Sequence, residues 1–141
     1  MMNWGELAAT SHYQTAFAVR QKILARDFEE AAQGIEELIE ALSRSDKRAL
    51  RSQLTRLMAH IIKWRIQPAR RSRSWVATIT NARIEIASIL ADEPNQKRNI
   101  PLLWDACLDA AQKIARDETG IEPSIGALTE QDVFVVPYTL P

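Results

Sequence analysis

The sequence predicts an all-α protein, a single-domain bundle of about five helices with an irregular C-terminal segment. Apolar residues recur at the i, i+3, i+4 spacing of a helix face over most of the chain. Glycine is scarce, with four in 141 residues, so little in the chain opposes helix formation. No repeat, low-complexity tract or linker-like composition divides residues 1–141, and a chain of this length can bury a core as one domain.

Two helices are expected in the first third of the chain. The first runs from about Glu6 to Ala25, after five less regular residues, and its apolar face is formed by Tyr13, Ala16, Phe17, Arg20, Ile23 and Leu24. Asp27 is then a candidate N-cap, with Glu30 three residues later as its capping-box partner. The second helix extends to about Leu42, and its buried stripe consists of Ile35, Leu38, Ile39 and Leu42.

A break is expected at residues 43–46. If the helix continued straight through them at 100° per residue, the first stripe would be rotated by about 80° from the next one. Ser45 could cap a new helix, with Asp46 at its positive end, although a kinked continuous helix is the alternative. The third helix ends at or before Gln67, because Pro68 disfavours helix in its predecessor. Its apolar face is formed by Leu50, Leu54, Leu57, Met58, Ile61 and Trp64.

Two further helices and an irregular end complete the prediction. Ser72 or Ser74 caps the fourth helix, whose inward residues are Trp75, Ile79, Ala82, Ile86 and Ile89. The fifth starts near Asn99 and ends at Gly120, and its stripe is Leu103, Ala106, Cys107, Ala110 and Ile114. Residues 121–141 contain three prolines and cannot form a long helix. Within them, we expect four side chains to pack on the bundle or on a second subunit: Phe134, Val135, Val136 and Tyr138.

The net charge of zero conceals an uneven distribution. Residues 1–43 sum to −4, residues 44–75 to +9 and residues 76–141 to −5. The single cysteine, Cys107, excludes an internal disulfide and suits a reducing compartment. The N-terminal residues do not have the pattern of a signal peptide, and no apolar run is long enough to span a membrane. We therefore expect a cytoplasmic protein without membrane contact.

A resemblance to a known family appears in the middle of the chain. The run LMAHIIKWRIQPARRSRSW, followed by ATI, Arg83 and Glu85-Ile86, closely resembles the bacterial "domain of unknown function" family number 29. The upstream IEELIEALSRSDKRALRSQL is also similar to that family, and the likeness covers roughly residues 12–120. The resemblance implies an almost wholly α-helical single domain with no assigned activity.

Catalytic and metal chemistry find little support in the residue pattern. His60 could act as a base, but the sequence points to no nucleophile or orienting carboxylate beside it, so a structural histidine is the preferred interpretation. Two histidines and no Glu-x-x-His pair are too few for a zinc or di-iron site, so we expect neither a metal nor a cofactor. We interpret Cys107 as a small core residue.

The basic 44–73 segment is the best candidate site. Arg44, Lys47, Arg48 and Arg51 form a stripe at helical spacing, and Arg70, Arg71 and Arg73 precede a helix N-terminus, which attracts anions. Trp64 and Trp75 either fix the corner around Pro68 or stack on a base or partner. Three interpretations of the arginines stay open: they bind nucleic acid, they bind a small anion, or they pair with the acidic helices of this chain or of a second copy. The last interpretation is preferred, since nucleic-acid-binding domains usually carry net positive charge.

Three functions stay open. The first is a non-enzymatic helical protein–protein interaction module, homo-oligomeric or bound to another protein. The second is a nucleic-acid or phosphate-binding protein that uses the basic segment. The third is an unrecognised enzyme that uses His60 with a carboxylate.

Overall fold

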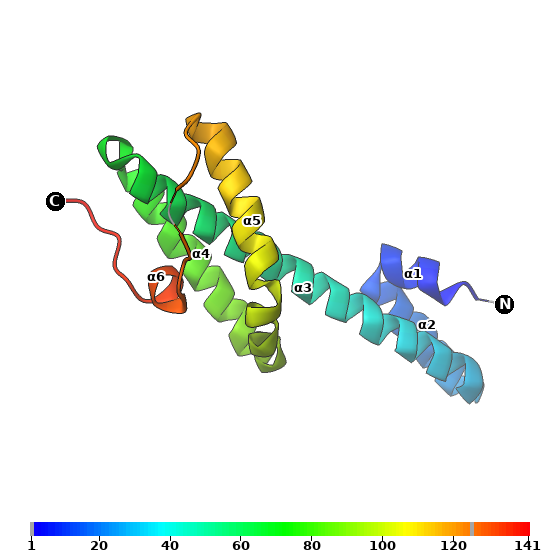
Figure 1. Cartoon of the computed structure of the whole chain (residues 1–141). Helices are drawn as coiled ribbons and strands as arrows, with labels where there is room; N and C mark the ends of the chain where they lie inside the picture. The colour runs from blue at the N-terminus through cyan, green and yellow to red at the C-terminus, as the bar shows by residue number, and fades with distance from the viewer. Residues whose placement is uncertain (1, 125) are drawn as a thin grey trace. The chain divides into compact units, whose positions relative to one another are not determined.

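The computed structural model describes residues 2–124 and 126–141, and this part of the chain contains helices and no strand (Figure 1). The elements are α1 (Trp4–Thr10), α2 (His12–Leu24), α3 (Phe28–Ile66), the 3-10 turn η1 (Pro68–Arg70), α4 (Arg73–Asp92), the 3-10 turn η2 (Pro94–Arg98), α5 (Asn99–Thr119) and α6 (Glu130–Phe134). The all-α prediction is therefore confirmed. Within the described residues, no helix combines the length and the apolar character needed to cross a membrane.

The chain separates into two compact units, Met1–Lys47 (the N-terminal unit) and Arg48–Pro141 (the C-terminal unit). Helix α3 contributes residues to both units. Whether the two units make one domain is not decided by this division, so the single-domain assignment stays a prediction.

The first predicted helix is two helices that meet at Ser11. The backbone of Ser11 is extended, its N–H donates to the carbonyl of Leu7 at the end of α1, and its side chain accepts the N–H of Gln14 at the start of α2. Asn3 caps α1 in the same way, by accepting the N–H of Glu6. The prediction of one helix from residue 6 to 25 was wrong because two good capping residues outweigh the continuous apolar pattern.

The core of the N-terminal unit is small and is made by residues that were not predicted. Its buried cluster is Trp4, Val19 and Ala31, with Leu7 and Ala18 packed against it. The indole of Trp4 also donates to the carboxylate of Glu30, with 2.9 Å between N and O. Gly34 carries no side chain, so Val19 and Trp4 approach its backbone closely.

The faces predicted to be buried in this unit are instead mostly exposed, although Leu38 is half-buried. On α2 the side chains of Tyr13, Phe17, Ile23 and Leu24 are exposed, and on α3 those of Ile35, Ile39 and Leu42. The predictions were wrong because α1 and α2 pack, through Trp4 and Val19, on another side of α3 that contains the small residues Ala31 and Gly34.

Helix α3 runs through residues 43–46 without a break. It starts after Asp27, whose carboxylate accepts the N–H of Glu30, so the predicted N-cap is confirmed. The preferred break at residues 43–46 was wrong and the continuous helix is the observed form. A rotation between the two apolar stripes would require a break only if both stripes faced one core. The stripe that includes Ile39 is exposed, whereas the stripe that includes Leu54 is buried.

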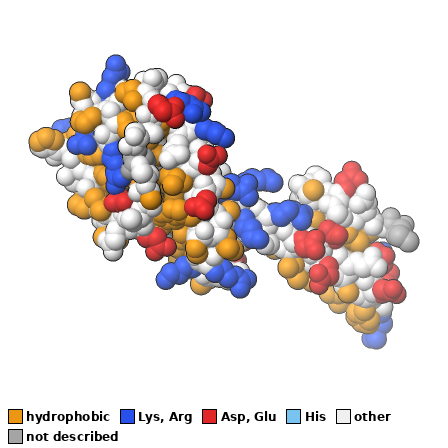
Figure 2. All heavy atoms as spheres, viewed as in Figure 1, with side chains coloured by type: hydrophobic (Ala, Val, Ile, Leu, Met, Phe, Trp, Pro, Cys, Tyr) orange, Lys and Arg blue, Asp and Glu red, His pale blue; other side chains and the backbone are white. Residues whose placement is uncertain are grey.

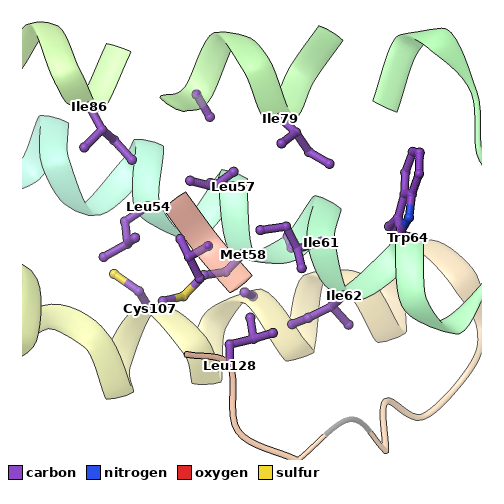
Figure 3. Close-up of a cluster of buried hydrophobic side chains, with 14 of the residues drawn as sticks. Leu54, Leu57, Met58, Ile61, Ile62, Trp64, Ile79, Ile86, Cys107 and Leu128 are labelled. Carbon is purple, nitrogen blue, oxygen red and sulfur yellow. The ribbon is translucent and has the colours of Figure 1, made fainter. Parts of the chain in front are cut away.

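The core of the C-terminal unit collects side chains from three long helices and the C-terminal segment (Figure 3). Helix α3 supplies Leu50, Leu54, Leu57, Met58, Ile61, Ile62 and Trp64, and α4 supplies Ile79, Ala82 and Ile86. Helix α4 begins after Ser72, which accepts the N–H of Trp75, as predicted. These two apolar faces were largely predicted, although Trp75 and Ile89 are only half-buried.

Helix α5 has the predicted ends but a different buried face. It starts at Asn99 and is closed by Gly120 in the left-handed conformation, as expected. Its buried residues are Asn99, Ile100, Cys107, Ala111 and Ala115. The predicted Ala106 and Ile114 are exposed. The buried face includes Ala111 and Ala115, whose small side chains allow close helix packing, in place of the larger Ile114.

Most of the C-terminal segment is attached to the C-terminal unit. Thr129 and Asp132 form a capping box that starts α6. The guanidinium of Arg83 donates to the carbonyls of Val133 and Val136, at 2.9 and 2.8 Å, and so binds carbonyls at the C-terminal end of this short helix. Tyr138 is buried and Phe134 is half-buried, as expected. Val135 and Val136 are exposed in the single chain, so for these two residues packing on a second subunit stays the prediction.

Candidate functional site

The corner between α3 and α4 uses one predicted arginine for packing. The guanidinium of Arg71 lies over the ring of Trp64, 4.7 Å from its centroid, and its Nε donates to the Trp64 carbonyl at 2.9 Å. Trp64 is buried and makes an edge contact with Tyr138, with ring centroids 5.8 Å apart. These contacts agree with the interpretation that Trp64 fixes the corner, and they involve Nε of Arg71, a residue that is itself exposed.

The other two arginines of the corner differ from Arg71, for which a packing partner is observed. Arg70 and Arg73 are exposed, and within residues 2–124 and 126–141 neither forms an ion pair. Of these three neighbouring arginines, Arg70 and Arg73 are therefore unpaired, and the guanidinium of Arg71 is stacked on Trp64.

The basic stripe of α3 is also mostly unpaired. Arg44 makes a long contact of 3.9 Å with Glu40 one turn earlier, and both side chains are exposed. Lys47, Arg48 and Arg51 are exposed and form no ion pair with any described carboxylate. Of the expected pairings with the acidic helices of the same chain, the described residues therefore show only the contact of Arg44 with Glu40. At 1.5 Å per residue, about 20 Å of helix separates Arg51 from the end of α3, before the group around Arg70.

A second charged cluster lies where α3, α4 and α5 meet, and the sequence did not predict it. The side chain of Lys63 is buried, its Nζ pairs with the carboxylate of Glu118 on α5, and it lies 5.5 Å from the centroid of the half-buried Trp75. A lysine within an otherwise apolar run was the only signal in the sequence, and Glu118 is 55 positions away.

His60 lies one turn before Lys63 and is held by its own helix. Its Nδ1 donates to the carbonyl of Arg56 at 3.0 Å. Burial lowers the pKa of His60 from its usual value and nearby Lys63 lowers it further, while the bond to Arg56 and the charge of Glu118 oppose the shift. In the described part of the chain, no hydrogen bond joins His60 to a nucleophile or a carboxylate. The geometry gives His60 the features of a neutral structural side chain.

Asp132 is the charged residue that organises the C-terminal segment. Its carboxylate accepts the backbone N–H of Thr129 at 2.9 Å and lies 3.0 Å from the guanidinium of Arg65 on α3. Bonds from the Thr129 backbone and hydroxyl, together with Arg65, lower the pKa of Asp132. Burial raises the pKa of the neighbouring Tyr138 hydroxyl, which donates to the Asp132 carbonyl at 2.7 Å. These contacts fasten α6 to α3.

A largely apolar cavity of about 540 Å³ lies beside α6 in the C-terminal unit. Its wall on α4 follows one helix face, and the other residues come from η2, α5 and α6. The lining residues are Arg83, Ile86, Ala87, Leu90, Lys97, Ile100, Pro101, Glu130 and Phe134. The guanidinium of Arg83 is already hydrogen-bonded to the carbonyls of Val133 and Val136, so it forms part of the cavity wall.

The most unusual surface belongs to the N-terminal unit. Figure 2 shows hydrophobic side chains gathered along the edge of this unit near the turn between α2 and α3. We define the apolar face as the exposed large apolar residues of these helices: Tyr13, Phe17, Ile23, Leu24, Phe28, Ile35, Ile39 and Leu42. Tyr13 is 73% exposed and Leu24 is 70% exposed. The sequence identified most of these residues as apolar stripes but placed them inside the molecule.

The α3 part of this face has the spacing of a coiled-coil seam. Starting at Phe28, the exposed apolar residues of α3 are separated by four, three, four and three positions: Phe28, Ala32, Ile35, Ile39 and Leu42. We call these five residues the α3 seam. Alternating steps of three and four place side chains along one line that faces a partner helix.

Comparison with known proteins gives a family and no activity. Among the described residues, no group of three or more His, Cys, Asp or Glu side chains could hold a metal ion. No curated protein and no solved structure matches the chain. A family model matches residues 13–135, which include the corner, the charged clusters and the apolar face. The chain therefore belongs to the family described as domain of unknown function DUF29.

Proposed function

We propose that this protein is a non-enzymatic helical protein–protein interaction module that forms a homo-oligomer through the apolar face of its N-terminal unit. The observation that carries the proposal is that this unit exposes more large apolar side chains than it buries in its core. Its buried cluster contains three residues, whereas its apolar face exposes eight large apolar side chains. Monomers rarely expose an apolar patch larger than a few hundred Å², and larger patches are typical of binding surfaces.

The area of the face supports a stable contact. If one fully exposed large apolar residue contributes about 200 Å², the observed exposures give the whole face roughly 850 Å². A standard protein–protein interface buries about 800 Å² on each partner. The single thiol, Cys107, is buried, and a module of this kind suits the cytoplasm, where thiols stay reduced.

The proposal is tested by measuring the molar mass in solution. The wild-type protein should form a dimer by light scattering at micromolar concentration. Ile39→Glu places a charge in the face and should weaken the association at least about 30-fold, as expected for a central interface residue. The matched control is Leu102→Glu, because Leu102 is also exposed but lies on α5 in the C-terminal unit. A wild-type protein that is monomeric at every concentration, or equal effects of the two substitutions, would contradict the proposal.

A second candidate, the binding of nucleic acid or phosphate, is favoured by the unpaired cations. The predicted basic residues without an ion pair to a described carboxylate are Lys47, Arg48, Arg51, Arg70, Arg71 and Arg73. Binding of this kind weakens steeply with salt, because each neutralised phosphate releases counterions. Fluorescence anisotropy with labelled RNA and DNA 20-mers at low salt should then show binding that Arg48→Glu with Arg51→Glu reduces. No binding at low salt would end this candidate.

A further inference from the structure

The α3 seam has no partner within its own unit. Its residues are exposed, while a different side of α3, represented by Ala31 and Gly34, packs against Trp4 and Val19. The helix therefore has two packing faces, one filled by its own unit and one open. An open seam of Phe, Ala, Ile, Ile and Leu at alternating spacing fits another helix with the same spacing.

We infer that the open seam packs against the same seam of a second copy, with the two α3 helices antiparallel. This inference rests on the proposed function and adds the partner helix and its direction. A symmetric dimer uses the same surface on both copies, and the four helices α2 and α3 of the two copies then form a four-helix bundle. The α3 seam exposes roughly 400 Å² on the same 200 Å² basis. The α2 residues must supply the rest of a standard interface.

The direction follows from which residues would face each other. In a parallel pair every residue faces its own copy, so Ala32 would face Ala32 and leave a gap beside the bulky Phe28 pair. In addition, Asp46, which continues the seam by sequence position, would face a second Asp46. Like charges facing each other in an apolar seam are strongly unfavourable.

An antiparallel pair removes both problems. With the two-fold axis near residue 37, Ile35 faces Ile39 of the second copy, and the small Ala32 faces the large Leu42. Each Asp46 lies beside a Phe28 at the end of the seam, where its carboxylate can reach water. The arrangement brings the two copies of Glu36 near the axis, on the rim of the seam. Repulsion between exposed rim charges is screened by salt and is small.

The glutamates near the axis give a signature of the direction. In the antiparallel dimer, Glu36→Gln removes the repulsion between two rim carboxylates, so the dimer should become several-fold tighter at low salt and this gain should shrink at high salt. In a parallel dimer Glu36 faces Ala31 instead, so the substitution should change the affinity little.

Cysteine cross-linking tests the inference directly. Two single variants, Ile35→Cys and Ile39→Cys, are mixed in equal amounts and oxidised, and the products are identified by mass spectrometry. The antiparallel seam predicts a cross-link between Cys at 35 and Cys at 39, because a disulfide needs Cα atoms closer than about 7 Å. Gln33→Cys, exposed on the other side of α3, is the matched control and should not cross-link. The native Cys107 is buried and should give no background.

The outcomes separate this inference from the proposed function. Efficient 35–39 cross-linking, with both variants dimeric under reducing conditions, supports the antiparallel seam. Cross-links only between identical positions would overturn it in favour of a parallel pair. A dimer that gives no cross-link at either position would overturn the seam, while the proposed function would stand with another geometry. A monomer would refute both.

Discussion

The close approach of two helices to Gly34 gives a prediction whose sign can be worked out. A Cβ atom at Gly34 would lie 2.6 Å from Val19 Cγ2 and 2.8 Å from Trp4 Cζ3. Both neighbours are buried and neither contact atom ends a long flexible side chain, so the helices would have to move apart. Overpacking of this kind costs about 1–3 kcal/mol, whereas alanine in place of an interior helix glycine gains about 1 kcal/mol. Gly34→Ala should therefore destabilise the N-terminal unit by up to about 2 kcal/mol.

The same substitution at Gly5 is the matched control. The nearest atom to a Cβ there is Glu37 Oε2 at 3.7 Å, which is an ordinary contact. Gly5 also lies in a helix of the same unit, so only the propensity gain applies, and Gly5→Ala should stabilise the unit by about 0.5–1 kcal/mol. The same glycine-to-alanine substitution should thus lower the stability of the unit at position 34 and raise it at position 5.

Hydrogen exchange measured by mass spectrometry can follow the N-terminal unit separately from the rest. Peptides from residues 28–42 should exchange up to about 30-fold faster in Gly34→Ala than in wild type, and somewhat slower in Gly5→Ala. Protein concentration must be equal throughout, because association also stabilises the unit. If Gly34→Ala slows the exchange as Gly5→Ala does, the close packing at Gly34 is refuted.

Three further predictions concern charged groups of the C-terminal unit. Glu118→Gln leaves the buried Lys63 without a counter-ion and should lower the free energy of unfolding by about 1 kcal/mol. The loss is small because the carboxylate is exposed to water. Adding Lys63→Met should restore the free energy of unfolding, which urea titrations measure. The pKa of Asp132 is lowered in the folded state, so its contribution to stability is present above about pH 4 and is lost as the pH falls through the folded pKa. Asp132→Asn should reduce this dependence of the free energy of unfolding on acid pH. The pKa of His60 is also lowered, so folding favours its neutral form, and the free energy of unfolding should fall as the pH drops below about 6.5. His60→Gln should remove that slope, and an unchanged slope would show that another group causes it.

Local signals in the sequence were sufficient for most helix ends. Asp27, Ser72 and Gly120 act as the predicted caps because capping depends on one or two nearby backbone groups. The split at Ser11 could have been found from the same kind of signal, since Ser11 and Gln14 have the spacing of a capping box. The break predicted at residues 43–46 came from a non-local assumption, namely that both apolar stripes of α3 belong to one core.

The tertiary parts of the candidate site could not be predicted in this way. The bonds from Arg83 to the carbonyls at the C-terminal end of α6 span about 50 positions, and no periodicity in a single sequence links such segments. The seven predicted cations illustrate the opposite error. Their sequence clustering suggested one site, but all seven are exposed and only Arg71 packs on Trp64.

The exposed stripes of the N-terminal unit show what periodicity measures. Regular apolar spacing on α2 and α3 indicates that these faces are to be buried, but it does not say whether by the same chain or by another. The N-terminal unit does not bury the α3 seam itself, because α1 and α2 pack on another side of the helix. Water contact at eight large apolar side chains is unfavourable at about 25 cal/mol per Å² of apolar area. The pattern and the exposure therefore agree with the proposed dimer, and cross-linking of residues 35 and 39 tests whether a second copy covers the face.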